Sequence, residues 1–326
     1  MLRTRSLVAA CVTIVALACS SLAAWPQDPN RILRQIKIVV PVPPGASTDF
    51  VARLMAEQIG RAQGLSIVVE NRPGASGMIG TEAVSRAAPD GATLLMTANT
   101  YLIDAQVRKA SYHSVESFAP ICFLVESPAV LVVNGASPYH SLADFLNAAR
   151  ARPGELTMAS VGPGTSFQIG FETFTHMANV NMIYVPYAGS APALNAVLGE
   201  HVTSVFAGYA VVAEQLKAGQ LRALATATLK RIEPLPDLPT FDELGFHDLE
   251  VDNWFGVIAP AKTPKETLKE LAGWFTSALQ APEVKARLAA QGLYPVGTCG
   301  DDFAALVHKR YDEYGQAIRE SNIKVP

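Results

Sequence analysis

The feature that most constrains this chain is the alternation of short apolar strands with amphipathic helices, joined by turns rich in glycine and proline. A strand is expected at Ile36–Val40, followed by a helix at about Asp49–Ile59 whose apolar residues recur at helical spacing. Strands separated by helices form parallel βαβ units. The sequence therefore predicts an α/β protein built on mostly parallel sheets.

The alternation continues along most of the chain. Further strands are expected at Ser66–Glu70, Ala92–Thr97, Val130–Val133, Leu156–Ser160, Met182–Val185, Ser204–Ala207 and Arg222–Thr226. Ser141 is expected to cap a helix. Beyond Trp254 the sequence indicates mostly helix, most clearly at Pro264–Leu279 and Glu283–Gln291. At 326 residues the chain is long enough for about two domains, and we expect lobe I over 25–125 plus 251–326 and lobe II over 126–250.

The N-terminus is typical of a secretory signal peptide. Arg3 and Arg5 precede the apolar run Ser6–Ala18, and small residues follow up to Ala24. This run is shorter than the ~20 apolar residues that a spanning helix needs, so cleavage of residues 1–24 is favoured over an uncleaved anchor. Cys19 leaves processing as a lipoprotein open. We expect the mature protein to be exported to the periplasm.

The net charge bears on the class of partner, and the cysteine content bears on whether the chain is cross-linked. The chain has 26 basic and 29 acidic residues, and loss of two arginines with residues 1–24 leaves a net charge of −5, which argues against a nucleic-acid binder. Only Cys122 and Cys299 remain after that cleavage. Their spacing alone does not decide whether they pair. Because a core of this size needs no covalent cross-link, we expect two unpaired, buried thiols.

Two loops share a pattern. Val42–Ser47 and Val161–Ser166 match at four of six positions, and each follows a strand and opens a helix. The free N–H groups and the dipole at a helix N-terminus favour an anion, so two such loops facing each other would hold one without lysine or arginine. The alternative is that Ser47, Thr48 and Ser166 are helix caps and nothing more.

Motifs for catalysis are missing. The sequence contains neither a G-x-S-x-G elbow nor a G-x-x-x-x-G-K-[ST] loop. Gly74–Gly80 is better explained as a tight turn into a helix than as a dinucleotide fingerprint. The six histidines lie more than 20 residues apart, which excludes a zinc motif of local spacing. We therefore expect a protein that is not an enzyme and needs no cofactor or metal.

Several blocks together carry a family resemblance. They are Val39–Asp49, Val68–Ala75, Pro89–Leu95, Phe118–Ile121, Gly162–Ser166, Val185–Leu194, Lys217–Gly219, Leu221–Ala225, Leu238–Thr240, Trp254–Gly256 and Ala259–Pro260. In this order they resemble the substrate-binding receptors of tripartite tricarboxylate transporters, the TctC or Bug family. The resemblance covers essentially the whole mature chain.

The resemblance implies a two-lobe periplasmic binding protein of type II that closes on its ligand. Such receptors act as monomers, bind small carboxylates, often dicarboxylates, and deliver them to a membrane permease of two subunits. A sensor that presents the same ligand to a signalling protein is the alternative. A secreted enzyme of the same architecture is a third and less favoured class.

The resemblance also implies the binding residues. In lobe I they are Pro44, Gly45, Ala46, Ser47, Thr48 and Asn99. In lobe II they are Gly164, Thr165, Ser166, Gln168, Tyr187, Gly189, Ser190 and Ala207. Ordered water often bridges the carboxylate to such loops.

Three positions depart from the family pattern. Ala46 replaces a second glycine, Gln168 replaces a common histidine, and Ala207 replaces a common acidic residue. Loss of that acid removes a partner for an amino group, so we expect a ligand without a cationic group, an aliphatic or aromatic mono- or dicarboxylate. Four aromatic residues either stack on a ligand ring or belong to the core, and the core is favoured. They are Tyr101, Tyr187, Tyr209 and Trp254.

Overall fold

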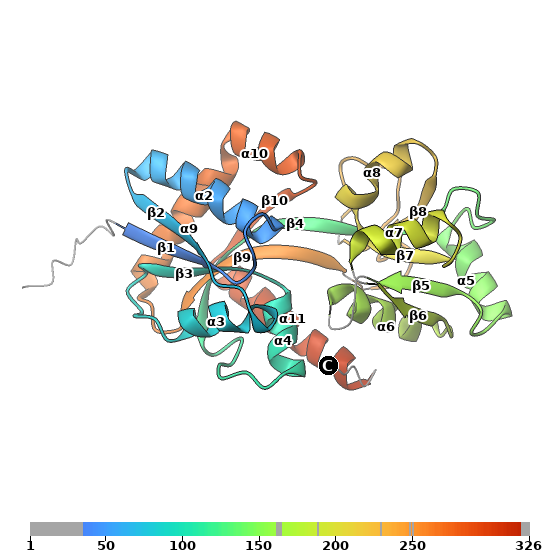
Figure 1. Ribbon diagram of the computed structural model, residues 1–326, viewed down its shortest axis with the longest axis horizontal. Helices are drawn as coiled ribbons and strands as arrows, with labels where there is room; N and C mark the ends of the chain where they lie inside the picture. The colour runs from blue at the N-terminus through green and yellow to red at the C-terminus, as the bar shows by residue number, and fades with distance from the viewer. Residues whose placement is uncertain are drawn as a thin grey trace, which may run out of the picture. The chain divides into compact units, whose positions relative to one another are not determined.

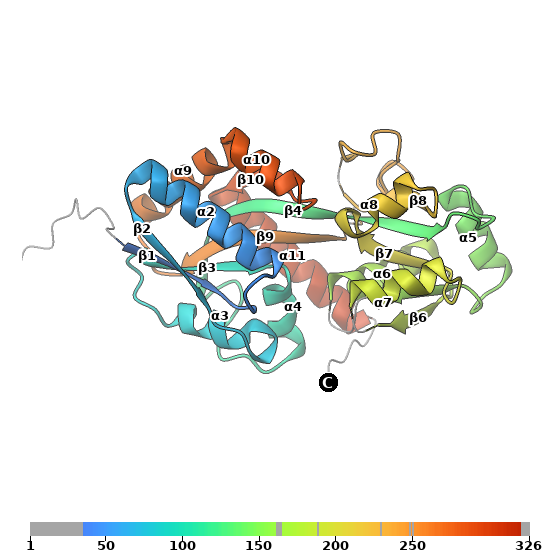
Figure 2. The same ribbon diagram turned by 45° about the horizontal axis from the view of Figure 1, so that its top comes forward.

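The computed structural model describes residues 35–160, 165–187, 189–228, 230–247, 249 and 251–320. The expected signal peptide at 1–24 and the expected binding residue Gly164 lie outside these ranges. Within them, no helix combines the length and the apolar character needed to cross a membrane. The fold is the expected two-lobe α/β architecture (Figures 1 and 2).

Lobe I is built on a mixed sheet. Its strands are β1 (Gln35–Val40), β2 (Ser66–Asn71), β3 (Thr93–Ala98), β4 (Phe118–Asn134), β9 (Asp252–Pro260) and β10 (Tyr294–Cys299). The first three are parallel in the order β2-β1-β3, and β9 then pairs antiparallel with both β3 and β4. The parallel part matches the expectation from sequence. Because β1, β2 and β3 are parallel, their carboxyl ends lie at one edge.

Helices cover both faces of this sheet. They are α2 (Ser47–Gln63), α3 (Met78–Ser85), α4 (Thr100–Val107), α9 (Lys265–Gln280), α10 (Pro282–Ala289) and α11 (Asp301–Glu320). Helices α2, α9 and α10 pack together on one face, and α3, α4 and α11 lie on the other (Figure 2). The short 3₁₀ turn η1 (Ala75–Gly77) leads into α3, as the glycine-rich segment predicts.

Lobe II repeats the arrangement with a shorter sheet. Its strands are the second half of β4, β5 (Thr157–Ser160), β6 (Ile183–Pro186), β7 (Ser204–Gly208) and β8 (Leu221–Thr226). Strands β6, β5 and β7 are parallel, in that order. Its helices are α5 (Leu142–Ala151), α6 (Ser166–Ala178), α7 (Ser190–Leu198) and α8 (Tyr209–Lys217). Ser141 caps α5 as expected, because its hydroxyl accepts a hydrogen bond from the Asp144 N–H.

Strand β4 connects the two sheets (Figure 1). Its first half pairs with β9 and β10, and its second half pairs with β7 and β8. The sequence indicated only Val130–Val133 of these 17 residues as strand. Proline has no N–H to donate a hydrogen bond to a neighbouring strand, so strands tolerate it mainly at irregular positions. Pro120 stands at such a position, beside a shift in the register of the β4–β9 pair.

The expectation of mostly helix beyond Trp254 was wrong for two segments, because β9 and β10 are strands. Strand β9 lies between β3 and β4 and is buried along nearly its whole length. A strand buried on both faces shows a continuous apolar run instead of a period of two, so periodicity does not separate it from a helix.

The cysteines also differ from expectation. A disulfide joins Cys122 to Cys299, so the expectation of two free thiols was wrong. The two residues stand directly opposite each other in the antiparallel pair of β4 and β10. They are 177 positions apart in the sequence, so only the strand pairing brings them together, and the spacing gave no sign of it.

Candidate ligand-binding site

Helix α2 begins at the carboxyl end of β1, where the first anion-binding loop is expected. Ala46 is its N-cap residue and makes no side-chain cap, so the reading of Ser47 and Thr48 as caps was wrong. They are instead the first two residues of the helix. Their N–H groups and that of Asp49 have no acceptor within the helix, because the first intrahelical bond runs from Phe50 N to Ala46 O. This end of α2 is therefore suited to an anion.

The buried carboxylate of Asp49 shapes the loop before α2. Its Oδ2 accepts hydrogen bonds from the Gly45 N–H at 2.9 Å and from Arg53 Nε at 3.0 Å. Its Oδ1 accepts one from Asn71 Nδ2 at 2.9 Å, and the same nitrogen lies 3.0 Å from the carbonyl oxygen of Val42. The Gly45 N–H is thus used in a hydrogen bond within the protein, and Gly45 has a φ angle of 89°. Burial raises the pKa of Asp49, but these hydrogen bonds outweigh it and lower the pKa overall.

A cavity of about 300 Å³ opens beside the first turn of α2. The residues that line it come from the ends of β1, β3 and β9 and from α2, η1, α3, α4 and the loop after α4. They are Pro41, Val42, Ala46, Ser47, Thr48, Ser76, Gly77, Thr81, Thr97, Ala98, Thr100, Tyr101, Asp104, Tyr112, Asn253 and Phe255. Among these described residues none is lysine or arginine. Attraction for an anion here must come from backbone N–H groups, hydroxyls and the helix end.

Two polar residues of this lining, Asp104 and Tyr112, were not singled out from the sequence. Asp104 is 7% exposed, and burial raises its pKa to about 6 although Arg108 Nε lies 3.4 Å from its Oδ1. Burial, together with the nearby Asp104, raises the pKa of Tyr112 to about 12, and the Thr81 side chain is its hydrogen-bond partner. No motif surrounds these residues. Asp104 lies on α4 and Tyr112 in the loop after it, and α3, which carries Thr81, packs against α4 beside the same cavity.

The expected residues of lobe II gather at one edge of its sheet. Thr165 is the N-cap of α6, and its hydroxyl accepts from the Gln168 N–H at 3.4 Å. The cap is therefore Thr165 and not Ser166, which lies in the first turn and is buried. Tyr187 extends the pairing of β5 and β6 through a bond from its N–H to Ser160 O at 2.8 Å. Because β5, β6 and β7 are parallel, their carboxyl ends meet here.

The expected residues differ in whether they line the 300 Å³ cavity. Gly189 is the N-cap of α7 at φ 128°, Ser190 is the exposed first residue of that helix, and Ala207 is buried near the end of β7. Ala46, Ser47 and Thr48 line the 300 Å³ cavity, whereas the lobe II residues do not. Asn99 is fully buried between β3 and α4. Whether the lobe II edge contacts the ligand stays a prediction.

The aromatic residues are mainly core, as favoured from the sequence. Trp254 is 1% exposed and packs edge-on against Tyr101, with ring centroids 6.0 Å apart. Tyr209 is buried in lobe II and Tyr187 is half-buried. Tyr101 differs from the others because it belongs to the core and also lines the cavity.

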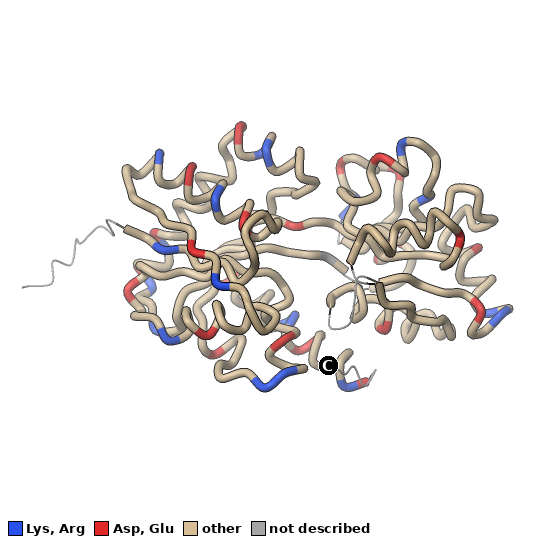
Figure 3. Tube along the Cα trace, viewed as in Figure 1, with Lys and Arg blue, Asp and Glu red and all other residues tan. Residues whose placement is uncertain are grey.

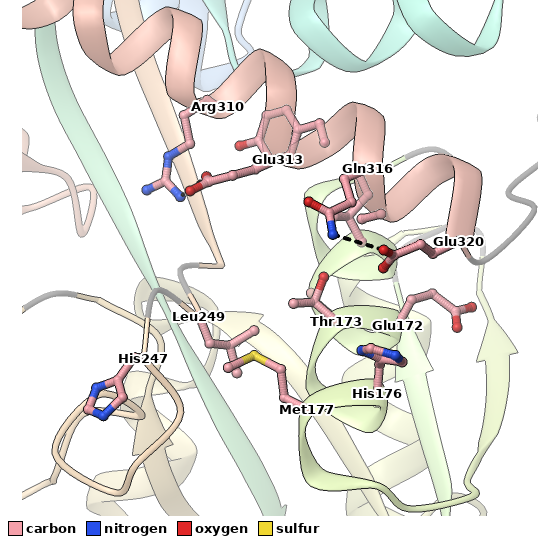
Figure 4. Close-up of a pocket in the computed structure, with 14 residues that line it drawn as sticks. Glu172, Thr173, His176, Met177, His247, Leu249, Arg310, Glu313, Gln316 and Glu320 are labelled. Carbon is pink, nitrogen blue, oxygen red and sulfur yellow. Dashed lines mark hydrogen bonds and ion pairs between the residues drawn. The ribbon is translucent and has the colours of Figure 1, made fainter.

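A second cavity, of about 290 Å³, lies between α6 and α11 (Figure 4). Glu172, Glu313 and Glu320 line it, and burial raises the pKa of Glu172. Arg310 also lines it, but its Nη1 lies 3.2 Å from Glu313 Oε2. Three carboxylates against one already paired cation repel an anion. Of these two cavities, the one beside α2 is better suited to an anion.

These features define a class. Two α/β lobes connected by shared strands, with helix N-termini at the carboxyl edges of both sheets, are the architecture of a periplasmic solute-binding protein. The chain belongs to the tripartite tricarboxylate transporter family of receptors, whose pattern it matches over residues 51–323. It is accordingly a receptor and not an enzyme.

Curated relatives agree with this assignment. The protein BugT of Bordetella pertussis is 31% identical over 314 residues, covering 95% of this chain and 96% of its own. A UPF0065 protein encoded between tcbD and tcbE in Pseudomonas sp. strain P51 is also 31% identical, over 96% of this chain and 92% of its own.

Solved structures show the same fold. A TctC solute-binding protein from Polaromonas, without ligand, is 25% identical with a TM-score of 0.83 and covers 91% of this chain and 99% of its own. Rpa4515 of R. palustris, solved with adipate, is 30% identical with a TM-score of 0.71 over 92% of this chain and 99% of its own. MatC of Rhodopseudomonas palustris, with bound malate, is 28% identical with a TM-score of 0.67 over 87% and 99%.

Proposed function

We propose that the mature chain is a periplasmic receptor that binds a small carboxylate between its lobes and delivers it to a two-subunit membrane permease. The observation that carries this proposal is the cavity beside the α2 N-terminus, which offers N–H groups and hydroxyls and whose described lining has no lysine or arginine. Such a site holds a carboxylate by local hydrogen bonds. The similar proteins solved with adipate and malate support this class of ligand.

Export follows from the expected signal peptide at residues 1–24. Once it is cleaved, the chain carries a net charge of −5, and such a protein does not attract anions through its overall field. Basic and acidic residues are interspersed along the described trace (Figure 3). The attraction that we propose is therefore local to the helix ends.

Ligand binding is tested by thermal unfolding of the mature protein with a panel of small carboxylates. A ligand present at 100 times its dissociation constant stabilises the folded state by ~2.7 kcal/mol, which raises the melting temperature by several degrees. We expect at least one carboxylate to do so. If no carboxylate raises the melting temperature, the proposal fails.

Substitution at α2 locates the site. Ser47 is exposed in the first turn, so Ser47→Trp is expected to block the cavity mouth and abolish the shift while the unliganded protein melts as before. Ser47 is a cleaner choice than Thr165, whose hydroxyl also caps α6. Ser277→Trp, at an exposed position of α9, is the matched control and should keep the full shift. A Ser47→Trp protein that still responds to the ligand would place binding elsewhere.

The partner is tested by co-purification. A tagged mature chain saturated with its carboxylate is expected to retain a two-subunit permease from solubilised membranes of its own host. Retention of a membrane kinase in its place would show the sensor role instead.

A further inference from the structure

The cavity beside α2 already contains an acid where the proposed ligand brings a second one. Asp104 on α4 lines this cavity together with Ser47 and Thr48 of the first turn of α2. Among the described lining residues, Asp104 is the only one with an acidic side chain, and it is 7% exposed. A carboxylate bound at the first turn of α2 therefore shares a cavity of only about 300 Å³ with the carboxyl group of Asp104.

Arg108 compensates only part of the charge of Asp104. It follows one helical turn later, with its Nε 3.4 Å from Asp104 Oδ1, and it is not among the described residues that line the cavity. Burial disfavours the charged carboxylate more than Arg108 favours it, and it raises the pKa of Asp104 to about 6. The protein thus holds Asp104 close to protonation before any anion arrives.

Other titratable groups lie on the segments next to α4. They are Lys109, Tyr112 and His113 in the loop after α4, Glu82 on α3, and Arg310 and Tyr314 on α11. Glu82 pairs with Arg86, and Arg310 pairs with Glu313. Of the six, only Tyr112 lines the cavity.

Asp104 is the only group of the described lining that changes its charge near neutral pH. The other titratable lining residues are Tyr101 and Tyr112. Burial raises the pKa of both hydroxyls, that of Tyr112 to about 12, so both stay neutral. The described lining contains no histidine. A pH dependence of binding between pH 6 and 9 is therefore assigned to one residue.

Two carboxylates in one small cavity disfavour each other's charge. In such a pair the proton stays on the group whose surroundings already favour the neutral form. The N–H groups and the dipole at the start of α2 stabilise the ligand as an anion. Burial destabilises Asp104 as an anion. The proton therefore goes to Asp104 and not to the ligand.

We propose that binding of a carboxylate beside α2 is coupled to uptake of a proton by Asp104, so that the receptor binds its ligand more tightly as the pH falls. This inference rests on the proposed function of the same cavity. The proton comes from the solvent and is held on the Asp104 carboxyl group, and no bond of the ligand changes. Because linkage is reciprocal, protonation of Asp104 raises the affinity for the carboxylate by the same factor by which the carboxylate favours protonation.

The sign of the pH dependence follows from this linkage. The bound anion raises the pKa of Asp104 above the value of about 6 in the unliganded protein. Between these two pKa values the complex holds a proton that the unliganded protein lacks, so the affinity falls as the pH rises through this range. Well below pH 6, Asp104 is neutral in both states and its contribution to the pH dependence vanishes.

The test is calorimetric titration of the mature protein at pH 6.5 and 8.5, where the carboxyl groups of the probes are ionised. The probes are adipate, malate, succinate and the most stabilising carboxylate of the thermal panel. For each probe that binds, we expect the dissociation constant to be at least about threefold larger at pH 8.5. Titrations at pH 7 in phosphate and in Tris, which differ in ionisation enthalpy, should report uptake of about half a proton.

The substitution Asp104→Asn keeps the shape of the side chain and removes its titration. At pH 8.5 this variant should bind at least about threefold more tightly than the unsubstituted protein, because the repelling charge is gone. Its affinity should differ by less than about 1.5-fold between the two pH values, and it should take up no proton.

Two control variants should keep the full pH dependence. Glu116→Gln changes an exposed acid outside the described lining. His113→Asn removes the histidine of the loop after α4, since histidine is the side chain type that ordinarily changes charge near neutral pH. Asparagine keeps a side-chain acceptor there, where His113 Nδ1 accepts from the Val115 and Glu116 N–H groups.

The outcomes separate the two proposals. If a carboxylate binds equally well at both pH values and without proton uptake, the coupling is wrong and the receptor function stands. An Asp104→Asn protein that keeps the full pH dependence would assign the proton to another group and would also overturn the inference. If no probe binds and no carboxylate stabilises the protein, the receptor function itself fails.

Discussion

Asp49 is the residue on which the geometry of the first loop depends most. Its carboxylate accepts hydrogen bonds from a backbone N–H before the helix, from Arg53 on α2 and from Asn71 at the end of β2. One buried side chain thus connects the loop, the helix and the neighbouring strand. The loop is held in place before any ligand arrives, which reduces the ordering cost of binding.

Replacing Asp49 should weaken both stability and binding. Asp49→Asn loses the charge that Arg53 and the Gly45 N–H share, so we expect the free energy of unfolding at pH 7 to fall by about 1–3 kcal/mol. Because the native pKa is lowered, this stabilisation is present at neutral pH and is lost as the pH falls below ~4, where the two proteins should converge. Urea unfolding across this range measures it.

Glu57→Gln is the matched control for this prediction. Glu57 is an exposed acid on the same helix that pairs with Arg61 and Arg287, and exposed pairs contribute little to stability because water and salt screen them. If Asp49→Asn costs no more than Glu57→Gln, the Asp49 network does not organise the loop.

Asp104 should show the opposite dependence on pH. Its native pKa of about 6 lies above the ordinary ~3.9, so between these values the folded protein binds a proton that the unfolded chain lacks. Stability from this group therefore falls as the pH rises from 4 to 6. Asp104→Asn should raise the free energy of unfolding by about 1–3 kcal/mol at pH 7.5 and leave it nearly unchanged below pH 4. A variant no more stable than the unsubstituted protein at pH 7.5 would contradict this.

At this scale the sequence predicted part of the site. The motif around Ser47 and Thr48 was recognisable because an anion-binding helix end is a local feature. Asp104 and Tyr112 were not recognisable, since an acid in a site proposed to bind a carboxylate contradicts simple charge matching. They line the cavity from α4 and from the loop after it, and no short motif records that arrangement.

Among the elements, the paired strands β4 and β10 carry the disulfide bond of the fold. The disulfide between Cys122 and Cys299 joins the strand shared by the lobes to the strand before α11. The two cysteines are 177 positions apart in the sequence, so the bond closes a long loop, and in the chain-entropy description long loops give the larger stabilisation.

Breaking this bond should destabilise the mature protein. We expect a reductant, or the double substitution Cys122→Ala and Cys299→Ala, to lower the free energy of unfolding by about 2–5 kcal/mol. The reductant should then have no effect on the double variant, because residues 25–326 contain no other cysteine. Equal unfolding curves with and without reductant would show that the bond is absent or energetically neutral.

The strands that could be predicted from the sequence are those with a local sequence pattern at their ends. Strands β1, β2, β3 and β5 to β8 were located within a few residues because each lies between turn residues and a helix. Strands β9 and β10 and most of β4 were missed. Their pairing is antiparallel and links distant segments, so nothing in their own sequences reports it.

For the whole molecule, the overall charge and the proposed local attraction for an anion have opposite signs of effect. Without the expected signal peptide at residues 1–24 the chain carries a net charge of −5, and basic and acidic residues are interspersed along its described trace (Figure 3). A receptor that used lysines or arginines would bind anions less tightly as salt increases, because ions screen such attraction. In this protein, added salt also screens the repulsion between the net negative charge of the chain and an anionic ligand.

Affinity should therefore depend little on salt. We expect the dissociation constant of the best carboxylate to change by less than about threefold between 20 and 500 mM sodium chloride. Calorimetric titrations at both concentrations measure this. A loss of tenfold or more at high salt would indicate a cationic site.

The central claim is that a small carboxylate lies at the N-terminus of α2, in the cavity that Asp104 and Tyr101 also line. A crystal structure of the mature protein with its most stabilising carboxylate tests this directly. We expect carboxylate oxygens bonded to the backbone N–H groups of Ser47 and Thr48, directly or through one ordered water molecule. A ligand found in the cavity between α6 and α11, or one held by a lysine or arginine side chain, would contradict it.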